Sequence, residues 1–104
     1  MINKIGEMPT KPGIYFFKDA KNQIIYIGKA KSIRKRVRSY FSSTHLKDPK
    51  TKVLVKNIAK IDYLVVRTET EALLTEASLI KQHKPRYNVY LKDDKTFPYI
   101  KITN

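Results

Sequence analysis

The chain has no cysteine and only two histidines. Without cysteine, disulfides, thiolate nucleophiles and zinc sites that use Cys ligands are all excluded. His45 and His83 are too few and too far apart to form a histidine metal site. Any metal ion bound by this chain is therefore expected to use oxygen ligands.

Long apolar stretches are also missing. No run of residues is long and apolar enough to span a bilayer, and the first residues, Met-Ile-Asn-Lys-Ile-Gly, lack the uninterrupted apolar segment of a signal peptide. These absences predict a cytoplasmic protein. The length of 104 residues predicts one small domain with a single modest core.

Acidic residues are scarce, since nine Asp and Glu stand against 22 Lys and Arg and leave a formal net charge of +13. Such a surplus attracts polyanions through the summed field of the surface. Nucleic acid is the favoured partner. An anionic membrane surface is the alternative, but the basic residues are spread along the whole chain and no long amphipathic basic helix isolates them.

Two segments that are dense in β-branched and aromatic residues, 14–17 and 24–27, are predicted to be strands. The polar segment between them suits a hairpin loop, so the strands should pair antiparallel and bring Tyr15 next to Tyr26. The other expected elements are a helix from the N-cap Ser32 to about Tyr40, a helix over 50–59, a strand over 63–66, a helix from a capping box at 68–71 to Pro85, and an extended segment at 99–102.

The first long predicted helix separates apolar from basic residues. Ile33, Val37 and Tyr40 share its apolar face. Arg36 is expected in a partly sheltered position at the edge of that face, where the pattern is compatible with a structural ion pair or with a functional role. The other basic residues point away from the apolar face and are interpreted as a solvated surface that contacts phosphate. They are Lys31, Arg34, Lys35 and Arg38.

Glu76 is the most unusual acidic residue, because apolar side chains surround it on its predicted helix. An ionised carboxylate in that position requires compensation. Either a metal ion or a buried salt bridge to Arg36 or Lys29 could provide it, and the pattern alone does not choose between them. The neighbours three and four positions away are Ala72, Leu73, Leu79 and Ile80.

The remaining carboxylates have simpler explanations. Glu69 and Glu71 fall in the first turn of the same helix, where capping and the helix dipole account for them. Asp93 and Asp94 lie between lysines and suit an exposed turn. A two-metal nuclease would need several converging carboxylates, so a site for one metal ion fits this chain better.

Tyrosine is abundant, with seven residues in the chain. Tyr63, Tyr90 and Tyr99 are expected to be packing residues. Tyr26 has a different setting, because it shares a strand face with Gly28, which should leave room above the sheet for a ligand backbone. Lys29 follows with a positive charge that would favour a phenolate, and a phenolate could act as a general base.

These residues lie in segments that resemble the GIY-YIG endonuclease family, and most closely the N-terminal nuclease domain of UvrC. The similarity extends over nearly the whole chain, and the order and spacing of the segments make it more specific than one tripeptide could be. The matching segments are 12–15 (PGIY), 26–31 (YIGKAK), 35–41 (KRVRSYF), 69–74 (ETEALL), Glu76, 85–89 (PRYNV) and 91–100 (LKDDKTFPYI).

The resemblance implies a small α/β (α+β) sandwich, in which helices flank a central antiparallel sheet of three main strands. It also implies that Glu76 is the sole protein ligand of one Mg²⁺ or Mn²⁺ ion, which favours the metal over the salt bridge. Tyr26 would be the general base for the attacking water, and Arg36 would stabilise charge on the scissile phosphate.

Four further residues receive supporting roles from the same resemblance. Lys29 would lie beside Tyr26, Tyr15 and Tyr40 would position the water and the phosphate, and Asn88 would support the site from the segment after the long helix. The implied reaction is hydrolysis of one DNA phosphodiester, which leaves a 3′-hydroxyl and a 5′-phosphate.

In the UvrC family this domain cuts on the 3′ side of damage during bacterial nucleotide excision repair, after UvrA and UvrB have located the lesion. The implied partners are damaged double-stranded DNA and UvrB, with no membrane partner, and a monomer is expected. Residues 1–104 would form a single GIY-YIG domain, from a longer UvrC or from a short homologue such as Cho.

A noncatalytic basic DNA-binding module is the rival interpretation. Glu76 argues against it, because a surface that only binds phosphate gains nothing from a nearby carboxylate.

Overall fold

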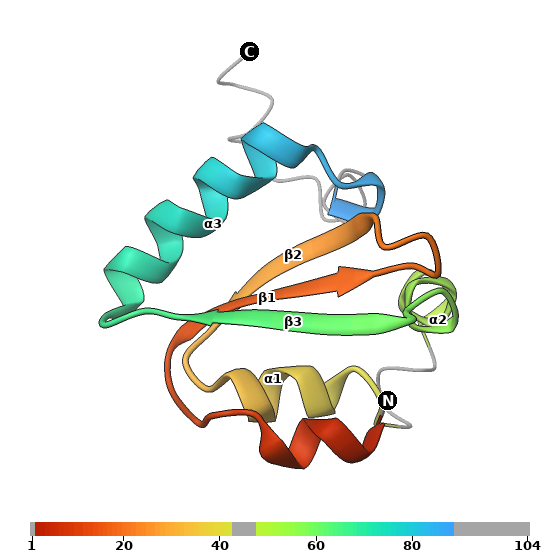
Figure 1. Ribbon diagram of the computed structural model, residues 1–104, viewed down its shortest axis with the longest axis horizontal. Helices are drawn as coiled ribbons and strands as arrows, with labels where there is room; N and C mark the ends of the chain where they lie inside the picture. The colour runs from red at the N-terminus through yellow and green to blue at the C-terminus, as the bar shows by residue number, and fades with distance from the viewer. Residues whose placement is uncertain (1, 43–47, 89–104) are drawn as a thin grey trace.

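The computed structural model describes residues 2–42 and 48–88 of the chain (Figure 1). Strands β1 (Gly13–Lys18) and β2 (Ile24–Ala30) form the predicted antiparallel hairpin. The loop between them is closed by a backbone hydrogen bond of 3.0 Å from Asp19 to Gln23, and the Asp19 carboxylate accepts two further backbone hydrogen bonds. The polar loop residues therefore fix the turn, as the sequence predicted.

Strand β3 (Lys60–Val65) completes a three-stranded sheet in the order β2-β1-β3, with both neighbouring pairs antiparallel. The expected three-stranded antiparallel sheet is confirmed. The strand begins three residues earlier than the predicted start at Tyr63, because polar residues at its beginning still pair with β1. One of them, Asp62, forms an ion pair of 2.7 Å with Lys18 on β1.

Three α-helices and one 3₁₀-helix surround the sheet. Helix α1 (Ile33–Ser39) begins at Ser32, whose hydroxyl accepts a hydrogen bond from the backbone of Lys35, as the N-cap prediction required. Helix α2 (Pro49–Lys56) ends before the predicted Ala59, because Asn57 caps it. The 3₁₀-helix η1 covers Ile2–Glu7.

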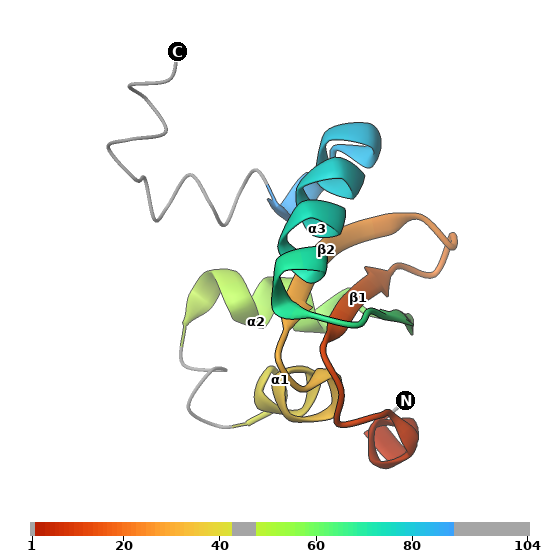
Figure 2. The same ribbon diagram turned by 90° about the vertical axis from the view of Figure 1, so that its left-hand side faces the viewer.

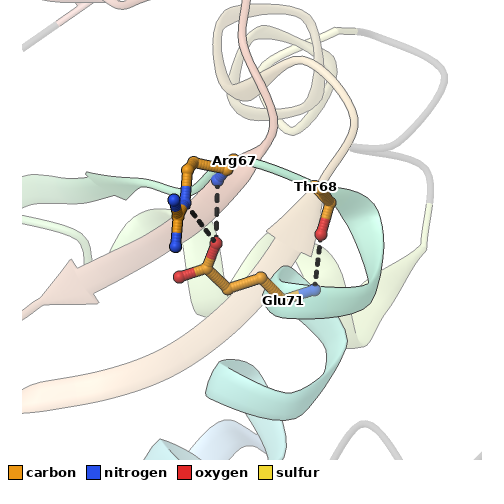
Figure 3. A network of polar contacts seen from close by, with 3 residues as sticks. All are labelled: Arg67, Thr68 and Glu71. Atoms are coloured by element: carbon orange, nitrogen blue, oxygen red, sulfur yellow. Dashed lines mark hydrogen bonds and ion pairs between the residues drawn. The ribbon is translucent and has the colours of Figure 1, made fainter.

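Helix α3 (Glu69–His83) begins at the predicted capping box, with one difference (Figure 3). The Thr68 hydroxyl accepts a hydrogen bond of 3.1 Å from the backbone of Glu71. The Glu71 carboxylate accepts from the backbone of Arg67 at 3.0 Å, one residue before the cap. At the other end, Lys84 has a left-handed backbone, with φ 45° and ψ 58°, and Pro85 follows. The predicted stop is therefore correct.

The sheet has a different helix on each face (Figures 1 and 2). One face packs against α1 and η1, and its buried cluster includes Tyr15, Phe17, Ile33, Val37 and Leu54. The other face packs against α3, and its buried cluster is Ile14, Ile27, Val66 and Ala72. A sheet of three strands between helices is the sandwich that the sequence predicted.

Several expectations are wrong or lie outside the described residues. Tyr63 is 45% exposed, so its expected role in packing is not borne out. The expectations for Tyr90, Asp93, Asp94, Tyr99 and the extended segment 99–102 concern residues that the structure does not describe. Within the described ranges, no helix combines the length and apolar character needed to cross a membrane.

Candidate active site

Four aromatic rings meet on the face of the sheet that packs against α1. Tyr15 and Phe17 come from β1, Tyr26 from β2 and Tyr40 from the residue that caps α1. The Tyr15 and Tyr26 ring centroids are 6.3 Å apart, and those of Phe17 and Tyr40 are 5.1 Å apart. The predicted proximity of Tyr15 and Tyr26 is confirmed. Phe17 was not singled out, although its spacing of two from Tyr15 places both on one strand face.

The tyrosine hydroxyls of this cluster are linked to one another. The Tyr15 and Tyr40 hydroxyl oxygens are 2.8 Å apart, which is a hydrogen bond. Burial, reinforced by the neighbouring hydroxyl of Tyr40, raises the pKa of Tyr15 and the pKa of Tyr26 above the usual value. In this protein alone both phenols are therefore protonated near neutral pH.

Two charged residues act on Tyr26 from opposite directions. The carboxylate of Glu76 on α3 raises the pKa of Tyr26, while the guanidinium of Arg36 on α1 lowers it. The structure thus brings Tyr26, Glu76 and Arg36 into one electrostatic neighbourhood, although they come from β2, α3 and α1. Arg36 is exposed, so the expected partly sheltered position is wrong, and its charge is open to a ligand.

Glu76 is only 9% exposed and lies on the inner side of α3, close to the buried Ala72. No described residue forms an ion pair with Glu76, so the alternative of a buried salt bridge to Arg36 or Lys29 is not observed. A buried carboxylate without a cationic partner fits a divalent cation, which prefers such oxygen ligands. Among the residues that the structure describes, no group of three His, Cys, Asp or Glu could hold a metal. One carboxylate would therefore have to serve with water.

Lys29 does not lie where the sequence argument placed it. In the β1–β2 register Tyr26 pairs with Phe17, whereas Lys29 pairs with Ile14. Phe17 and Ile14 belong to the clusters on opposite faces of the sheet. Successive side chains alternate between the two faces, so Lys29 leaves the sheet on the face opposite to Tyr26. The positive charge that favours the Tyr26 phenolate comes from Arg36 instead.

Gly28 also differs from expectation. It is buried opposite Tyr15 in the strand pair, and a Cβ atom placed on it would collide with the ring and the hydroxyl of Tyr15. The space above Gly28 is therefore filled by Tyr15 and is not free for a ligand backbone. Glycine at this position allows the Tyr15 ring to lie flat over the sheet.

Asn88 acts on the backbone of β2. Its side-chain oxygen accepts a hydrogen bond of 2.7 Å from the Ile27 N–H, and its side-chain nitrogen donates one of 2.8 Å to the Ile27 carbonyl. Asn88 is 1% exposed. Because Ile27 lies on an edge strand, the amide satisfies backbone groups that no neighbouring strand reaches. This contact holds in place the strand that carries Tyr26.

The expected phosphate-contacting surface is only partly as predicted. Lys31, Lys35 and Arg38 are exposed and leave α1 toward solvent. Arg34 instead turns toward the N-terminal segment, where its Nε donates a hydrogen bond of 2.8 Å to the Met8 carbonyl. Arg34 therefore fastens η1 to α1 and is less available to a ligand.

Comparison with known proteins agrees with this arrangement. Residues 11–89 match the UvrC-like GIY-YIG domain. Curated relatives include UvrABC system protein C of Solibacter usitatus, 54% identical over 98% of this chain, and that of Bdellovibrio bacteriovorus, 52% identical over 97% of this chain. The chain spans 16% of the length of each of these relatives.

Solved structures show the same fold. The GIY-YIG N-terminal endonuclease domain of UvrC from Thermotoga maritima, bound to magnesium as its catalytic divalent cation, superposes with a TM-score of 0.76. It is 40% identical to this chain, and the match covers 85% of this chain and 94% of that one. The chain belongs to the UvrC-like GIY-YIG family and is an endonuclease domain of that type.

Variants of the Thermotoga domain sharpen the comparison. Its structures include three single substitutions of tyrosine by phenylalanine and one of asparagine by alanine, and the catalytic cation is bound in each. In that protein, therefore, none of these four side chains is required for the cation to bind.

Proposed function

We propose that this chain cuts one strand of DNA with the help of a single Mg²⁺ or Mn²⁺ ion held by Glu76. The observation that carries the proposal is the buried Glu76 carboxylate, which has no cationic partner among the described residues and lies close enough to Tyr26 to raise its pKa. When bound, the ion would supply Lewis-acid activation at the scissile phosphate and would offset the charge of Glu76.

The side chains of the site suit the individual steps of phosphodiester hydrolysis. The Tyr26 phenol would accept the proton of the attacking water, for which it needs nearby positive charge, since burial now keeps it protonated. The exposed guanidinium of Arg36 would stabilise the charge that develops on the phosphate. Tyr15 and Tyr40, joined through their hydroxyls, would orient the water and the phosphate.

The remaining candidates have supporting parts. Asn88 would keep β2 in position through Ile27. Lys29, on the opposite face of the sheet from Tyr26, would contribute only through contact with DNA. Lys31, Lys35 and Arg38 would bind phosphates next to the site, and the net charge of +13 supports such contacts.

The biological setting follows from the relatives, which are components of the UvrABC system. We propose that the cut falls on the 3′ side of damage in nucleotide excision repair, leaving a 3′-hydroxyl and a 5′-phosphate. Damaged double-stranded DNA loaded with UvrB would be the substrate, and the bacterial cytoplasm would be the location. The chain would act as a single monomeric GIY-YIG domain within a longer UvrC or in a short homologue.

The test is cleavage of a strand-labelled duplex that carries one lesion and is preloaded with UvrB, with Mg²⁺ or Mn²⁺ present. Wild type is expected to make one nick 3′ to the lesion. Glu76→Gln is expected to lower the rate at least about 100-fold, because a metal ion supplies several kcal/mol to such a transition state. Glu69→Gln is the matched control, because it removes an exposed carboxylate from the same helix.

Metal binding is measured separately, by titrating Mn²⁺ into each variant and following its paramagnetic resonance signal. Loss of binding in Glu76→Gln alone supports the assignment of the ligand. Equal cleavage by Glu76→Gln and wild type would contradict the proposal. If wild type and variants bind DNA but none cuts it with either metal, a noncatalytic DNA-binding module becomes the better explanation.

A further inference from the structure

A second polar site lies where the β1–β2 hairpin meets the end of α3. A cavity of about 560 Å³ is present there, and none of the candidate active-site residues lines it. In Figure 1 the end of α3 and the turn that follows it lie close to the start of β2. The lining residues are Asn22, Gln23, Ile24, Ile25, His83, Lys84 and Arg86.

The lining is basic and contains no acidic residue. In the part of the chain that the structure describes, His83, Lys84 and Arg86 form no ion pair. The Arg86 guanidinium lies 5.0 Å from the centroid of the Tyr87 ring, which restricts its position. Unpaired cations that surround a cavity favour an anionic ligand.

Helix electrostatics explain only part of this arrangement. Basic residues at the end of a helix interact favourably with its dipole, which accounts for His83 and Lys84 without a ligand. Arg86 lies beyond the end of α3, however, and the exposed Asn22 and Gln23 come from another element. Their side-chain amides add hydrogen-bond donors to a cavity that already carries positive charge. Guanidinium, ammonium and amide donors together are the groups that proteins use to bind phosphate.

The cavity and the candidate active site are built on the same two elements. On β2, the lining residue Ile25 directly precedes Tyr26. On α3, His83 follows Glu76 by seven residues, which corresponds to about 10 Å at about 1.5 Å per residue. A DNA strand rises about 3.4 Å per nucleotide along the helix axis, so about 10 Å corresponds to about three nucleotides.

We propose that this cavity binds a phosphate of the cleaved DNA strand, about three nucleotides from the bond that is cut beside Glu76 and Tyr26. The proposal rests on the nuclease function proposed above and adds a second contact with the same strand. The contact is made to the backbone, so it fixes the register of the strand and carries no sequence preference. A short domain would gain precision from it, because two separated phosphates define the direction of a strand.

The first experiment measures DNA binding without cleavage, in EDTA, over a range of salt concentrations. Lys84→Gln combined with Arg86→Gln is expected to weaken binding about 10-fold at low salt and to reduce the salt dependence by about one unit of slope per lost contact. Lys56→Gln combined with Lys60→Gln is the matched control, since it removes the same charge from exposed residues outside the cavity. Equal loss in both double variants would overturn the proposal.

The second experiment locates the phosphate. Single neutral methylphosphonates are placed at each of the six linkages on either side of the cleavage site. Wild type is expected to lose affinity when the modification lies about three nucleotides away on one side, and the cavity variant is expected to show no further loss there. A position effect that is identical in wild type and in the cavity variant would contradict the assignment.

Two additional arms keep the outcomes distinct. Because Arg86 also packs on Tyr87, His83→Gln combined with Lys84→Gln repeats the test without disturbing that contact. Titration with inorganic phosphate tests a free anion as ligand, and variant-sensitive phosphate binding with a flat methylphosphonate scan would overturn the DNA contact. If the scan shows the predicted position but wild type never cuts with metal, the nuclease function fails while the phosphate site stands.

Discussion

The two faces of the sheet are built from different side chains and carry different tasks. The face toward α1, here called the aromatic face, holds the rings of Tyr15, Phe17, Tyr26 and Tyr40. The face toward α3, here called the aliphatic face, has a smaller buried cluster of Ile14, Ile27, Val66 and Ala72. Reactive hydroxyls therefore lie inside the better packed half of the molecule, while the candidate metal ligand comes from the helix on the other half.

This division explains how a small domain can hold polar groups rigidly. On the aromatic face, each hydroxyl is attached to a ring that packs against other rings, so its position follows from the core itself. On the aliphatic face, α3 needs only enough contact to present Glu76, and it leaves Leu73 and Leu74 exposed at 50% and 66%. Substitutions should therefore reduce the free energy of unfolding more on the aromatic face than on the aliphatic face.

The strongest test uses two adjacent phenylalanines of β1 that point to opposite faces. Phe17 is fully buried on the aromatic face, whereas Phe16 is half-buried on the aliphatic face. Phe17→Ala is expected to lower the free energy of unfolding by about 3–5 kcal/mol. Phe16→Ala should cost about 2 kcal/mol or less, since less area leaves water there. Urea unfolding measures both, and equal losses would mean that the faces do not differ in packing.

The next test concerns the close contact between the hairpin strands on the aromatic face. Gly28→Ala would place a methyl group against the Tyr15 ring, and we expect a loss of about 1–3 kcal/mol in the free energy of unfolding. Gly6→Ala is the control, because no atom lies within 4 Å of an added Cβ there. If thermal unfolding shows Gly28→Ala to be as stable as Gly6→Ala, Tyr15 is able to move away and the aromatic face is less rigid than the structure indicates.

Local patterns were sufficient to predict most of the fold from the sequence. The hairpin followed from two β-rich segments with a polar loop, and the starts of α1 and α3 followed from Ser32 and Thr68. The errors arose where tertiary contacts set a boundary. The start of β3 was missed because Asp62 looks unlike a strand residue until its ion pair with Lys18 is known.

The candidate site was predicted less well than the fold, because its geometry depends on which strand faces meet. The sequence placed Lys29 beside Tyr26, but a side-chain period of two puts it on the other face. It left space above Gly28 that Tyr15 fills. No sequence pattern marks the bond between Asn88 and Ile27, which joins residues 61 positions apart. Family resemblance alone indicated that Asn88 belongs near the site.

The third test asks whether β2 depends on its link to the residue after α3. Asn88→Ala would leave the Ile27 N–H and carbonyl without partners in a buried setting, with an expected loss of about 1–3 kcal/mol in the free energy of unfolding. Asn57→Ala is the control, since its amide is exposed and water can replace it. Hydrogen exchange should show faster exchange at Ile27 in Asn88→Ala only. Unchanged protection there would indicate that another group holds the edge of β2.

The smallest expected effect is a change in the response of stability to alkaline pH. Burial raises the pKa of Tyr15 and of Tyr26 above the ordinary value of 10.0, so the folded protein favours their protonated forms. Their contribution is fully present below pH 10 and is lost as the pH rises above it, because the unfolded chain then releases protons that the folded chain keeps.

Tyr26→Phe removes one of these two groups from the aromatic face. At neutral pH it should change the free energy of unfolding by no more than about 1 kcal/mol, because only a hydroxyl and its hydrogen bond are lost. Between pH 10 and pH 11, however, the variant should lose about 1 kcal/mol less stability than wild type. Urea unfolding at pH 8, 9, 10, 10.5 and 11 gives both profiles. Parallel profiles would show that the Tyr26 phenol ionises in the folded protein as readily as in water, and the base proposed for the nuclease would then need no added positive charge to lose its proton.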